Sequence, residues 1–239
     1  MKLESHATTE VIVRAAGARL AGILTIPERA AGLVIFAHGS GSSRLSPRNT
    51  RVARMLNDGS LATLLFDLLT LEEEVIDEAT AEFRFDIGLL TRRLMGAIDW
   101  AGSHQPTGRL RVGLFGASTG AAAALIAAAR MPGAVDAVVS RGGRVDLAGD
   151  YLPRVKAPTL LIVGGRDAGV IELNAAARAR MTTKVSLEIV PGAGHLFDRP
   201  GELEQVAGLA CRWFTDRLGG QAETLPDPSS QDEEDPDCG

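Results

Sequence analysis

Short apolar runs alternate with longer segments of helical spacing along most of the chain. An uninterrupted apolar run is typical of a strand that is buried on both faces of a sheet. The pattern opens with residues 11–14 and 20–26, which read as two strands of a hairpin joined at Ala16-Gly17. The later apolar runs lie at residues 33–37, 61–66, 110–115, 135–140, 159–163 and 185–190.

Between these runs the hydrophobic positions recur at the spacing of a helix. One helix is expected to start at Ser46-Pro47 and to end near residue 58, because proline suits the first helical turn. Others are expected within residues 80–100, 121–130, 170–181 and 202–218. The alternation of strands and helices predicts an α/β fold, in which helices flank a mostly parallel central sheet of about eight strands.

The sequence changes character after Leu218. Residues 219–239 are acidic and rich in proline, and they offer almost nothing that a core could bury. The 239 residues of the chain suit one sizeable domain better than two. We therefore predict one domain at residues 1–218 and a disordered tail at residues 219–239.

Composition and charge narrow the class of protein. The net charge of -5, with no basic stripe, argues against a nucleic-acid partner. Cys211 and Cys238 are the two cysteines, too few for a disulfide framework. Neither a signal peptide nor an apolar run of about 18 residues is evident, so no membrane span is expected. These features predict a cytoplasmic protein.

The strongest chemical signal is the pattern Gly116-x-Ser118-x-Gly120, which follows a predicted strand and opens a predicted helix. A serine at such a sharp turn projects its hydroxyl above the sheet, and this is the context of a nucleophile elbow. Glycines on either side remove side chains that would clash as the chain doubles back. The alternative is a glycine-rich turn in which the serine merely caps the helix.

Asp167 and His195 follow two later strands, each just beyond the carboxyl end. Asp167 alone could be the N-cap of the next helix, and a lone histidine is usually structural or solvated. Together with Ser118 they occur in the order Ser, Asp, His, which is the chain order of α/β hydrolases. We therefore expect Ser118 as the nucleophile, His195 as the general base and Asp167 as the residue that orients the histidine.

A second glycine-rich loop, His38-Gly39-Ser40-Gly41, follows the strand at residues 33–37. Such a loop can turn backbone N–H groups toward a developing oxyanion. We assign the oxyanion hole to the backbone N–H groups of Ser40 and Thr119, and expect His38 to hold the loop by hydrogen bonds. The alternative is an anion-binding glycine turn, although the loop lacks the lysine and the spacing of a P-loop.

From about residue 9 to residue 218 the sequence resembles the α/β-hydrolase superfamily, and within it the dienelactone-hydrolase-like group. The motifs that carry the resemblance are HGSGSS, GASTG, GGRD and GAGHLF. Similar domains, some fused to phosphoribosyltransferases, carry blocks that look like SPRN, FDLLTLEEE and SRGGRVDLAG. The resemblance implies an α/β-hydrolase fold with hydrolase activity. Typical dienelactone hydrolases use a cysteine nucleophile, however, so Ser118 points instead toward ordinary carboxylic esters.

The substrate is expected to be a small or varied ester. The connection at residues 141–158 is too short for a large cap domain. The acidic connection at residues 67–85 could overhang the site, but the interpretation that we favour for Glu72 to Glu74 is the solvated start of a helix. Arg44 and Arg141 could clamp a substrate carboxylate bidentately. The interpretation that we favour for both arginines from sequence alone is a role at the surface or in bracing a loop.

Two alternatives share the same residues. A thioesterase or acyltransferase would use the same triad, and a binding module could retain a hydrolase scaffold without catalysis. No metal site is evident, since the four histidines lack paired spacing. This chemistry needs no cofactor. Apart from a small ester substrate, the only partner that we consider is a second copy in a homodimer.

Overall fold

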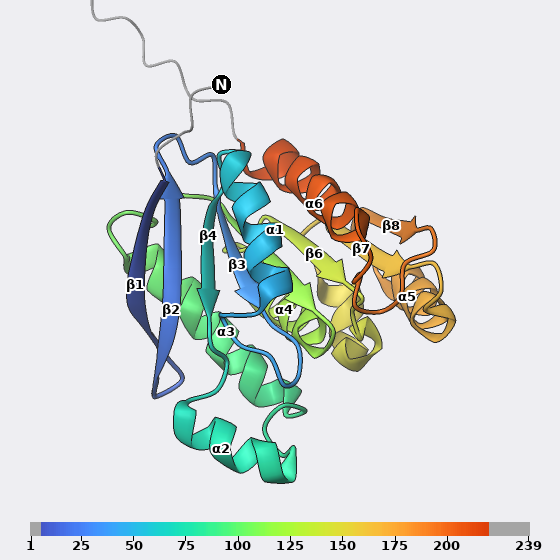
Figure 1. Ribbon diagram of the computed structural model, residues 1–239, viewed down its shortest axis with the longest axis horizontal. Helices are drawn as coiled ribbons and strands as arrows, with labels where there is room; N and C mark the ends of the chain where they lie inside the picture. The colour runs from blue at the N-terminus through green and yellow to red at the C-terminus, as the bar shows by residue number, and fades with distance from the viewer. Residues whose placement is uncertain (1–5, 220–239) are drawn as a thin grey trace, which may run out of the picture.

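The computed structural model describes residues 6–219, which form a single eight-stranded sheet with helices on both faces (Figure 1). The strand order is β1-β2-β4-β3-β5-β6-β7-β8. The pairs β1–β2 and β2–β4 are antiparallel, and the other five pairs are parallel. The strands are β1 (His6–Ala15), β2 (Ala18–Pro27), β3 (Leu33–Ala37), β4 (Ala62–Phe66), β5 (Val112–Ala117), β6 (Ala137–Arg141), β7 (Thr159–Gly164) and β8 (Val185–Val190).

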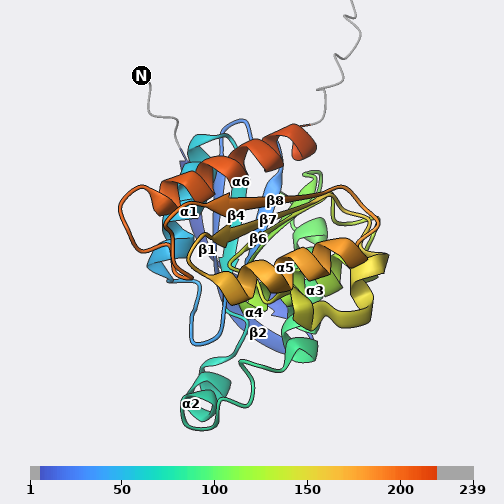
Figure 2. The ribbon, with the colours of Figure 1, turned by 90° about the vertical axis from the view of Figure 1, so that its right-hand side faces the viewer.

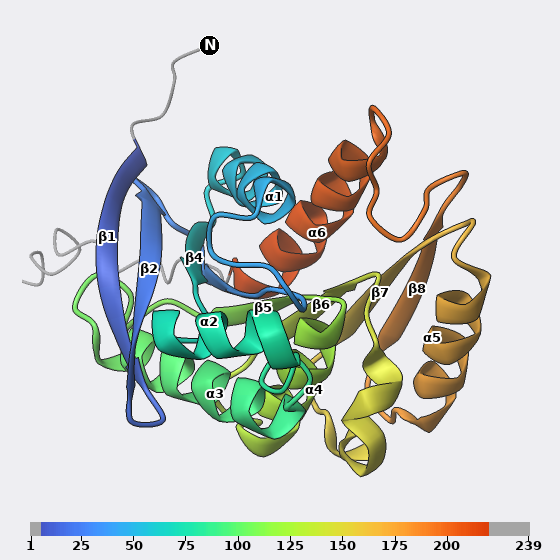
Figure 3. The ribbon, with the colours of Figure 1, turned by 60° about the horizontal axis from the view of Figure 1, so that its bottom comes forward.

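The helices divide between the two faces of the sheet (Figures 2 and 3). Helices α1 (Pro47–Asp58) and α6 (Glu202–Leu218) pack against each other on one face. Helices α3 (Ile87–Ser103), α4 (Thr119–Arg130) and α5 (Ala168–Arg180) lie on the other. This arrangement confirms the predicted α/β-hydrolase fold without a large cap domain.

Two hydrophobic clusters fill the space between the sheet and the helices. Val34, Phe115 and Val139 face α1 and α6, whereas Ile35, Leu114 and Val138 face α3 and α4. The side chains of a strand point to alternate faces, so an uninterrupted apolar strand supplies both clusters. The parallel strands of this sheet end at one common edge, which brings distant loops together there.

Two elements lie in connections for which the sequence predicted no complete helix. Helix α2 (Leu71–Thr80) occupies part of the acidic connection and stands beyond the carboxyl ends of β3 and β4 (Figure 1). A 3₁₀ segment, η1 (Val145–Arg154), occupies most of the connection after β6 and packs on α4 and α5. Helix α2 has only 10 residues and η1 is broken at Gly149, so the hydrophobic spacing of neither is distinctive.

The end of the predicted domain and the start of the predicted tail lie at the end of the described residues. Helix α6 ends at Leu218, where the predicted domain ends. The predicted tail lies outside the described residues except for Gly219. Within residues 6–219, no helix has the length and hydrophobicity needed to cross a membrane.

Candidate active site

Ser118 lies between β5 and α4 with φ 51° and ψ -120°. This is a sparsely populated backbone conformation for a residue with a side chain, and it costs on the order of 1–3 kcal/mol. Backbone hydrogen bonds hold it. The Ser118 N–H donates to the Arg141 carbonyl at 3.2 Å, and the Arg144 N–H donates to the Ser118 carbonyl at 3.0 Å. The strained turn therefore has the backbone geometry expected of a nucleophile elbow.

The glycines around Ser118 are required by close backbone approaches. A Cβ on Gly120 would lie 2.2 Å from the Ala37 carbonyl oxygen, and one on Gly116 would lie 2.4 Å from Ala121 Cα. A Cβ on Gly39 would lie 3.0 Å from the Cβ of Ser118. The first two contacts are too short for any side chain, so the Gly-x-Ser-x-Gly pattern follows from the packing of α4 against β3 and β5.

His195 and Asp167 meet beside this turn. His195 Nδ1 lies 2.7 Å from Asp167 Oδ2, so the ring donates its Nδ1–H to the carboxylate. Asp167 occupies the N-cap position of α5 but makes no capping hydrogen bond with its side chain. The carboxylate therefore orients His195 instead of capping the helix, and Nε2 of the ring remains available for a proton.

The end of β6 connects the loops of Ser118 and His195. Arg141 accepts the Ser118 N–H, and a Cβ on the next residue, Gly142, would lie 3.5 Å from His195 Nδ1. No hydrogen bond joins the Ser118 hydroxyl to His195 among the described residues. Such catalytic hydrogen bonds often tighten only when substrate binds. The structure thus brings all three predicted residues to one sheet edge.

The loop predicted to form the oxyanion hole is engaged by Thr119. The Ser40 N–H donates to Thr119 Oγ1 at 3.1 Å, and the two hydroxyl oxygens lie 3.0 Å apart. In this conformation Thr119 therefore occupies the Ser40 N–H, and the assignment of that N–H to the oxyanion hole stays a prediction. The Thr119 N–H is the first of α4 and has no acceptor within the helix, so it can point toward an oxyanion.

His38 braces the same loop. Its Nε2 accepts the Leu68 N–H at 3.0 Å, so the proton is assigned to Nδ1, which donates to the Gly39 carbonyl at 3.0 Å. Burial lowers the pKa of His38 below its ordinary value of 6.5 and outweighs the opposing effects of Gly39 and Asp67. His38 is therefore a neutral structural residue, in the role expected from the sequence.

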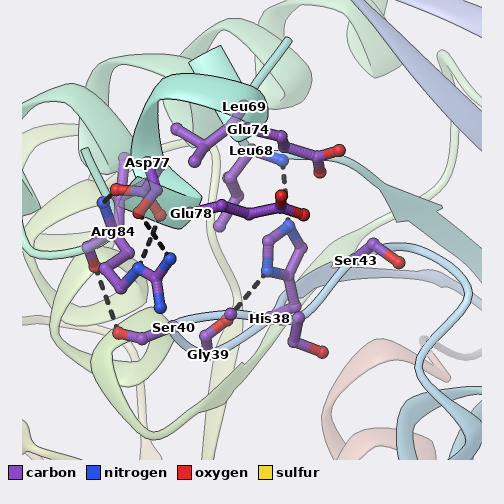
Figure 4. A pocket seen from close by; sticks show the side chains of 13 residues that line it. His38, Gly39, Ser40, Ser43, Leu68, Leu69, Glu74, Asp77, Glu78 and Arg84 are labelled. Atoms are coloured by element: carbon purple, nitrogen blue, oxygen red, sulfur yellow. Dashed lines mark hydrogen bonds and ion pairs between the residues drawn. The ribbon is translucent and has the colours of Figure 1, made fainter. Parts of the chain in front are cut away.

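A cavity of about 440 Å³ lies between this loop and α2 (Figure 4). Asp77 anchors its outer wall, because its carboxylate accepts the N–H groups of Phe83 and Arg84 at 2.8 Å and Arg84 Nε at 2.6 Å. The Arg84 carbonyl in turn accepts the Ser40 hydroxyl at 3.2 Å. Helix α2 thus overhangs the oxyanion loop, and Glu72 to Glu74 lie in its first turn, so both interpretations of this acidic connection hold.

The pKa values of two carboxylates in this wall are shifted in opposite directions. Burial on its own raises the pKa of Asp77, but hydrogen bonds from Arg84 and Phe83 hold it below 3.8. Burial and the charge of Asp67 raise the pKa of Glu74. The sequence did not reveal Asp77 and Arg84 as residues of the site, because only their tertiary contacts distinguish them from other surface charges.

The two candidate substrate-binding arginines differ in their surroundings. The Arg44 guanidinium forms an ion pair with the buried Asp67, and its backbone N–H donates to the same carboxylate at 2.7 Å. This pairing supports the loop-bracing role. Arg141 is 8% exposed, and its Nη1 is buried without a hydrogen-bond partner.

From residue 6 to residue 219, no cluster of metal-ligating side chains is present.

Comparisons with known proteins agree with this fold. The model of the dienelactone hydrolase family matches residues 20–216. The chain is similar to the crystal structure of a dienelactone hydrolase from Anabaena variabilis, with 56% identity, a TM-score of 0.88 and coverage of 89% of this chain and 99% of that one. It is similar in fold to Est1E from Butyrivibrio proteoclasticus, with 16% identity, a TM-score of 0.73 and coverage of 88% and 99%.

Two curated relatives come from strains of Mycobacterium tuberculosis, and both are named "Putative phosphoribosyl transferase". Each is 58% identical to this chain over 211 residues, which cover 88% of this chain and 47% of the relative. The chain therefore spans about half the length of these relatives, and their name describes a longer protein.

Proposed function

The chain belongs to the dienelactone hydrolase family, and on that premise we propose that it is a serine hydrolase that cleaves carboxylic esters through an acyl-enzyme intermediate. The observation that carries this proposal is the strained Ser118 turn at the sheet edge where His195 and Asp167 share a hydrogen bond. Dienelactone hydrolases typically use cysteine at this turn. Serine at position 118 favours ordinary esters over dienelactones.

In the proposed reaction, the Ser118 oxygen attacks the ester carbonyl carbon while His195 Nε2 takes the hydroxyl proton. Asp167 keeps the other ring nitrogen protonated and stabilises the imidazolium. The tetrahedral intermediate collapses, and the alcohol leaves with the proton from His195. A water molecule, deprotonated by the same histidine, then releases the acid and restores the Ser118 hydroxyl.

Backbone N–H groups stabilise the oxyanion in this mechanism. The Thr119 N–H supplies one donor, and the Ser40 N–H supplies the second once the Thr119 hydroxyl turns away from it. Each such donor is worth roughly 3 kcal/mol in comparable sites. A conformational change of one threonine side chain is therefore part of the proposal.

The relatives named for phosphoribosyl transfer support no second function here. This chain covers 47% of each relative, so the named activity cannot be assigned to this half. Thioester cleavage or acyl transfer would use the same residues, and no contact in the described structure favours either over ester hydrolysis. The lack of a large cap domain in residues 6–219 fits small or varied esters.

Labelling with a fluorophosphonate probe tests the proposal. We expect wild-type protein to be labelled, with the adduct on Ser118 by mass spectrometry, and Ser118→Ala to remain unlabelled. Ser103→Ala is the matched control, because Ser103 is exposed at the end of α3 and should not affect labelling. A wild-type protein that resists the probe, or an adduct on another serine, would refute the assignment and favour a binding module.

A further inference from the structure

Arg141 carries a buried positive charge that the described structure does not neutralise. It follows Val139 by two positions in β6, so its side chain points to the face covered by α1 and α6. The residue is 8% exposed, Nη1 has no hydrogen-bond partner, and no acidic side chain between residues 6 and 219 forms an ion pair with it. Arg93, which is 3% exposed, is by contrast paired: its Nη2 donates to Glu73 Oε1 at 2.6 Å.

A second unpaired arginine belongs to α1, which covers the face of the sheet to which Arg141 points. Arg48 is the second residue of α1, and its Nε is also buried without a partner. Burial and then the charge of Arg48 lower the pKa of Arg141 to about 10. Arg48 is half-buried and Arg141 is buried, so this pair of like charges is costly unless an anion joins them. Three other buried charges, Asp67, Asp77 and Arg93, have charged partners.

A groove of about 680 Å³ leads from solvent to Arg48. It runs between α1 and the loop after His195, and Phe197 forms part of its wall. Its charged lining residues are Arg48, Arg51, Arg54, Asp198, Arg199 and Glu204, of which Arg51 and Glu204 pair with each other. The unpaired charges are predominantly positive, so the groove attracts anions.

The two arginines lie on the His195 side of Ser118. Arg141 accepts the Ser118 N–H through its carbonyl, and the adjoining Gly142 packs against His195. In an acyl-transfer reaction the histidine protonates the leaving alcohol. A group bound by Arg48 and Arg141 therefore belongs to the alcohol part of the substrate, provided that the proposed ester hydrolysis is correct.

We propose that Arg48 and Arg141 form a subsite for a phosphate group on the alcohol part of the ester substrate. Two guanidinium groups together carry two positive charges, which a phosphate dianion balances and a single carboxylate does not. Arginine binds phosphate oxygens in bidentate geometry, and the N-terminus of α1 adds an electrostatic contribution at Arg48. The subsite thus selects phosphorylated esters.

Thermal unfolding tests the subsite without catalysis. Inorganic phosphate should raise the Tm of wild-type protein and of Ser118→Ala, relative to chloride at equal ionic strength. Arg141→Met should lose this response and should melt no lower than wild type without phosphate, because a buried unpaired charge is itself destabilising. Arg54→Met, which removes an exposed charge from the same groove, should keep the response. A wild-type Tm that phosphate leaves unchanged would overturn the subsite.

Substrate preference tests what the subsite does. With acetate release as the readout, 4-acetoxyphenyl phosphate should exceed phenyl acetate in kcat/KM by about tenfold or more. Arg141→Met should bring this kcat/KM ratio close to one, whereas the control Arg54→Met should keep it. A stronger preference for 4-acetoxybenzoate would overturn phosphate in favour of a carboxylate. Stabilisation by phosphate without any preference for the phosphorylated ester would overturn the substrate assignment and leave free phosphate as the ligand.

The two proposals can fail separately. If phosphate stabilises the protein but no ester is cleaved and no probe labels Ser118, the reaction is wrong and only anion binding at the arginines survives. If phenyl acetate is cleaved but phosphate affects neither Tm nor turnover, ester hydrolysis stands and the phosphate subsite is refuted.

Discussion

His195 Nδ1 lies 2.7 Å from Asp167 Oδ2, although 28 positions separate the two residues in the sequence. Both follow neighbouring parallel strands, β7 and β8, whose carboxyl ends lie at the same edge. Asp167 stands where a helix cap is expected, yet its carboxylate binds the ring. The pairing fixes the imidazole with its proton on Nδ1, the tautomer that leaves Nε2 free to accept a proton from a nucleophile.

Asp167→Asn should lower kcat for 4-nitrophenyl acetate by about three to four orders of magnitude. The amide keeps the shape of the carboxylate, but its NH₂ group favours the wrong tautomer of His195. Asp150→Asn is the matched control, since Asp150 is exposed and its partner is Arg180. A loss of less than tenfold in Asp167→Asn, measured at saturating ester, would remove Asp167 from the mechanism.

Thr119→Val should separate stability from catalysis at the oxyanion loop. Valine removes the hydroxyl that accepts the Ser40 N–H and contacts the Ser40 hydroxyl, which should lower the free energy of unfolding by about 1–2 kcal/mol. The same change frees the Ser40 N–H for the oxyanion, so kcat/KM should stay within about threefold or rise.

Urea unfolding and ester hydrolysis measure the two effects of Thr119→Val. Thr119→Ser keeps the hydroxyl and should behave as wild type in both. If kcat/KM of Thr119→Val falls by a hundredfold while Thr119→Ser retains it, the hydroxyl itself acts on the oxyanion and the backbone assignment at Ser40 is incorrect.

Asp77→Asn should weaken the wall formed by α2 in a pH-dependent way. The folded pKa of Asp77 lies below 3.8, its ordinary value, so its ionised form stabilises the fold above about pH 4. This contribution is lost as the pH falls through the lowered pKa. The Tm of Asp77→Asn should therefore lie below that of wild type at pH 7, and the difference should shrink below about pH 4.

Melting curves from pH 7 to the acid limit of solubility give this comparison. Asp150→Asn again serves as the control, because an exposed carboxylate contributes little at any pH. A Tm difference between wild type and Asp77→Asn that stays constant down to the lowest pH would show that the Asp77 charge does not stabilise α2.

Sequence alone predicted the parts of this structure that local rules determine. The buried strand Leu33–Ala37 has an uninterrupted apolar run, and Gly116 and Gly120 flank a serine in a pattern that few other turns require. These features predicted the sheet and brought Ser118 to its edge. The positions of His195 and Asp167 followed from the order of the strands.

The side-chain contacts of the site could not be predicted in this way. The Ser40 N–H and the Thr119 hydroxyl are 79 positions apart, and no periodicity indicates that one would bind the other. The absence of an acidic partner for Arg141 is likewise a property of the folded interior. Helix α2 was missed as a complete element because it is amphipathic over few turns and lies outside the main layers.

Arg44→Ala should act on stability and leave substrate charge selection alone. Its guanidinium pairs with Asp67, which is 5% exposed, so the substitution leaves a buried carboxylate with only the backbone N–H of residue 44. We expect a loss of about 1–3 kcal/mol in the free energy of unfolding, measured in urea. Arg51→Ala, which breaks the exposed pair with Glu204, should leave unfolding unchanged within error.

The ratio of kcat/KM for 4-acetoxybenzoate to that for phenyl acetate should change by less than about twofold in Arg44→Ala, because an arginine already neutralised by Asp67 has little attraction left for a substrate anion. A selective loss of the acidic ester, with stability preserved, would instead make Arg44 a substrate clamp.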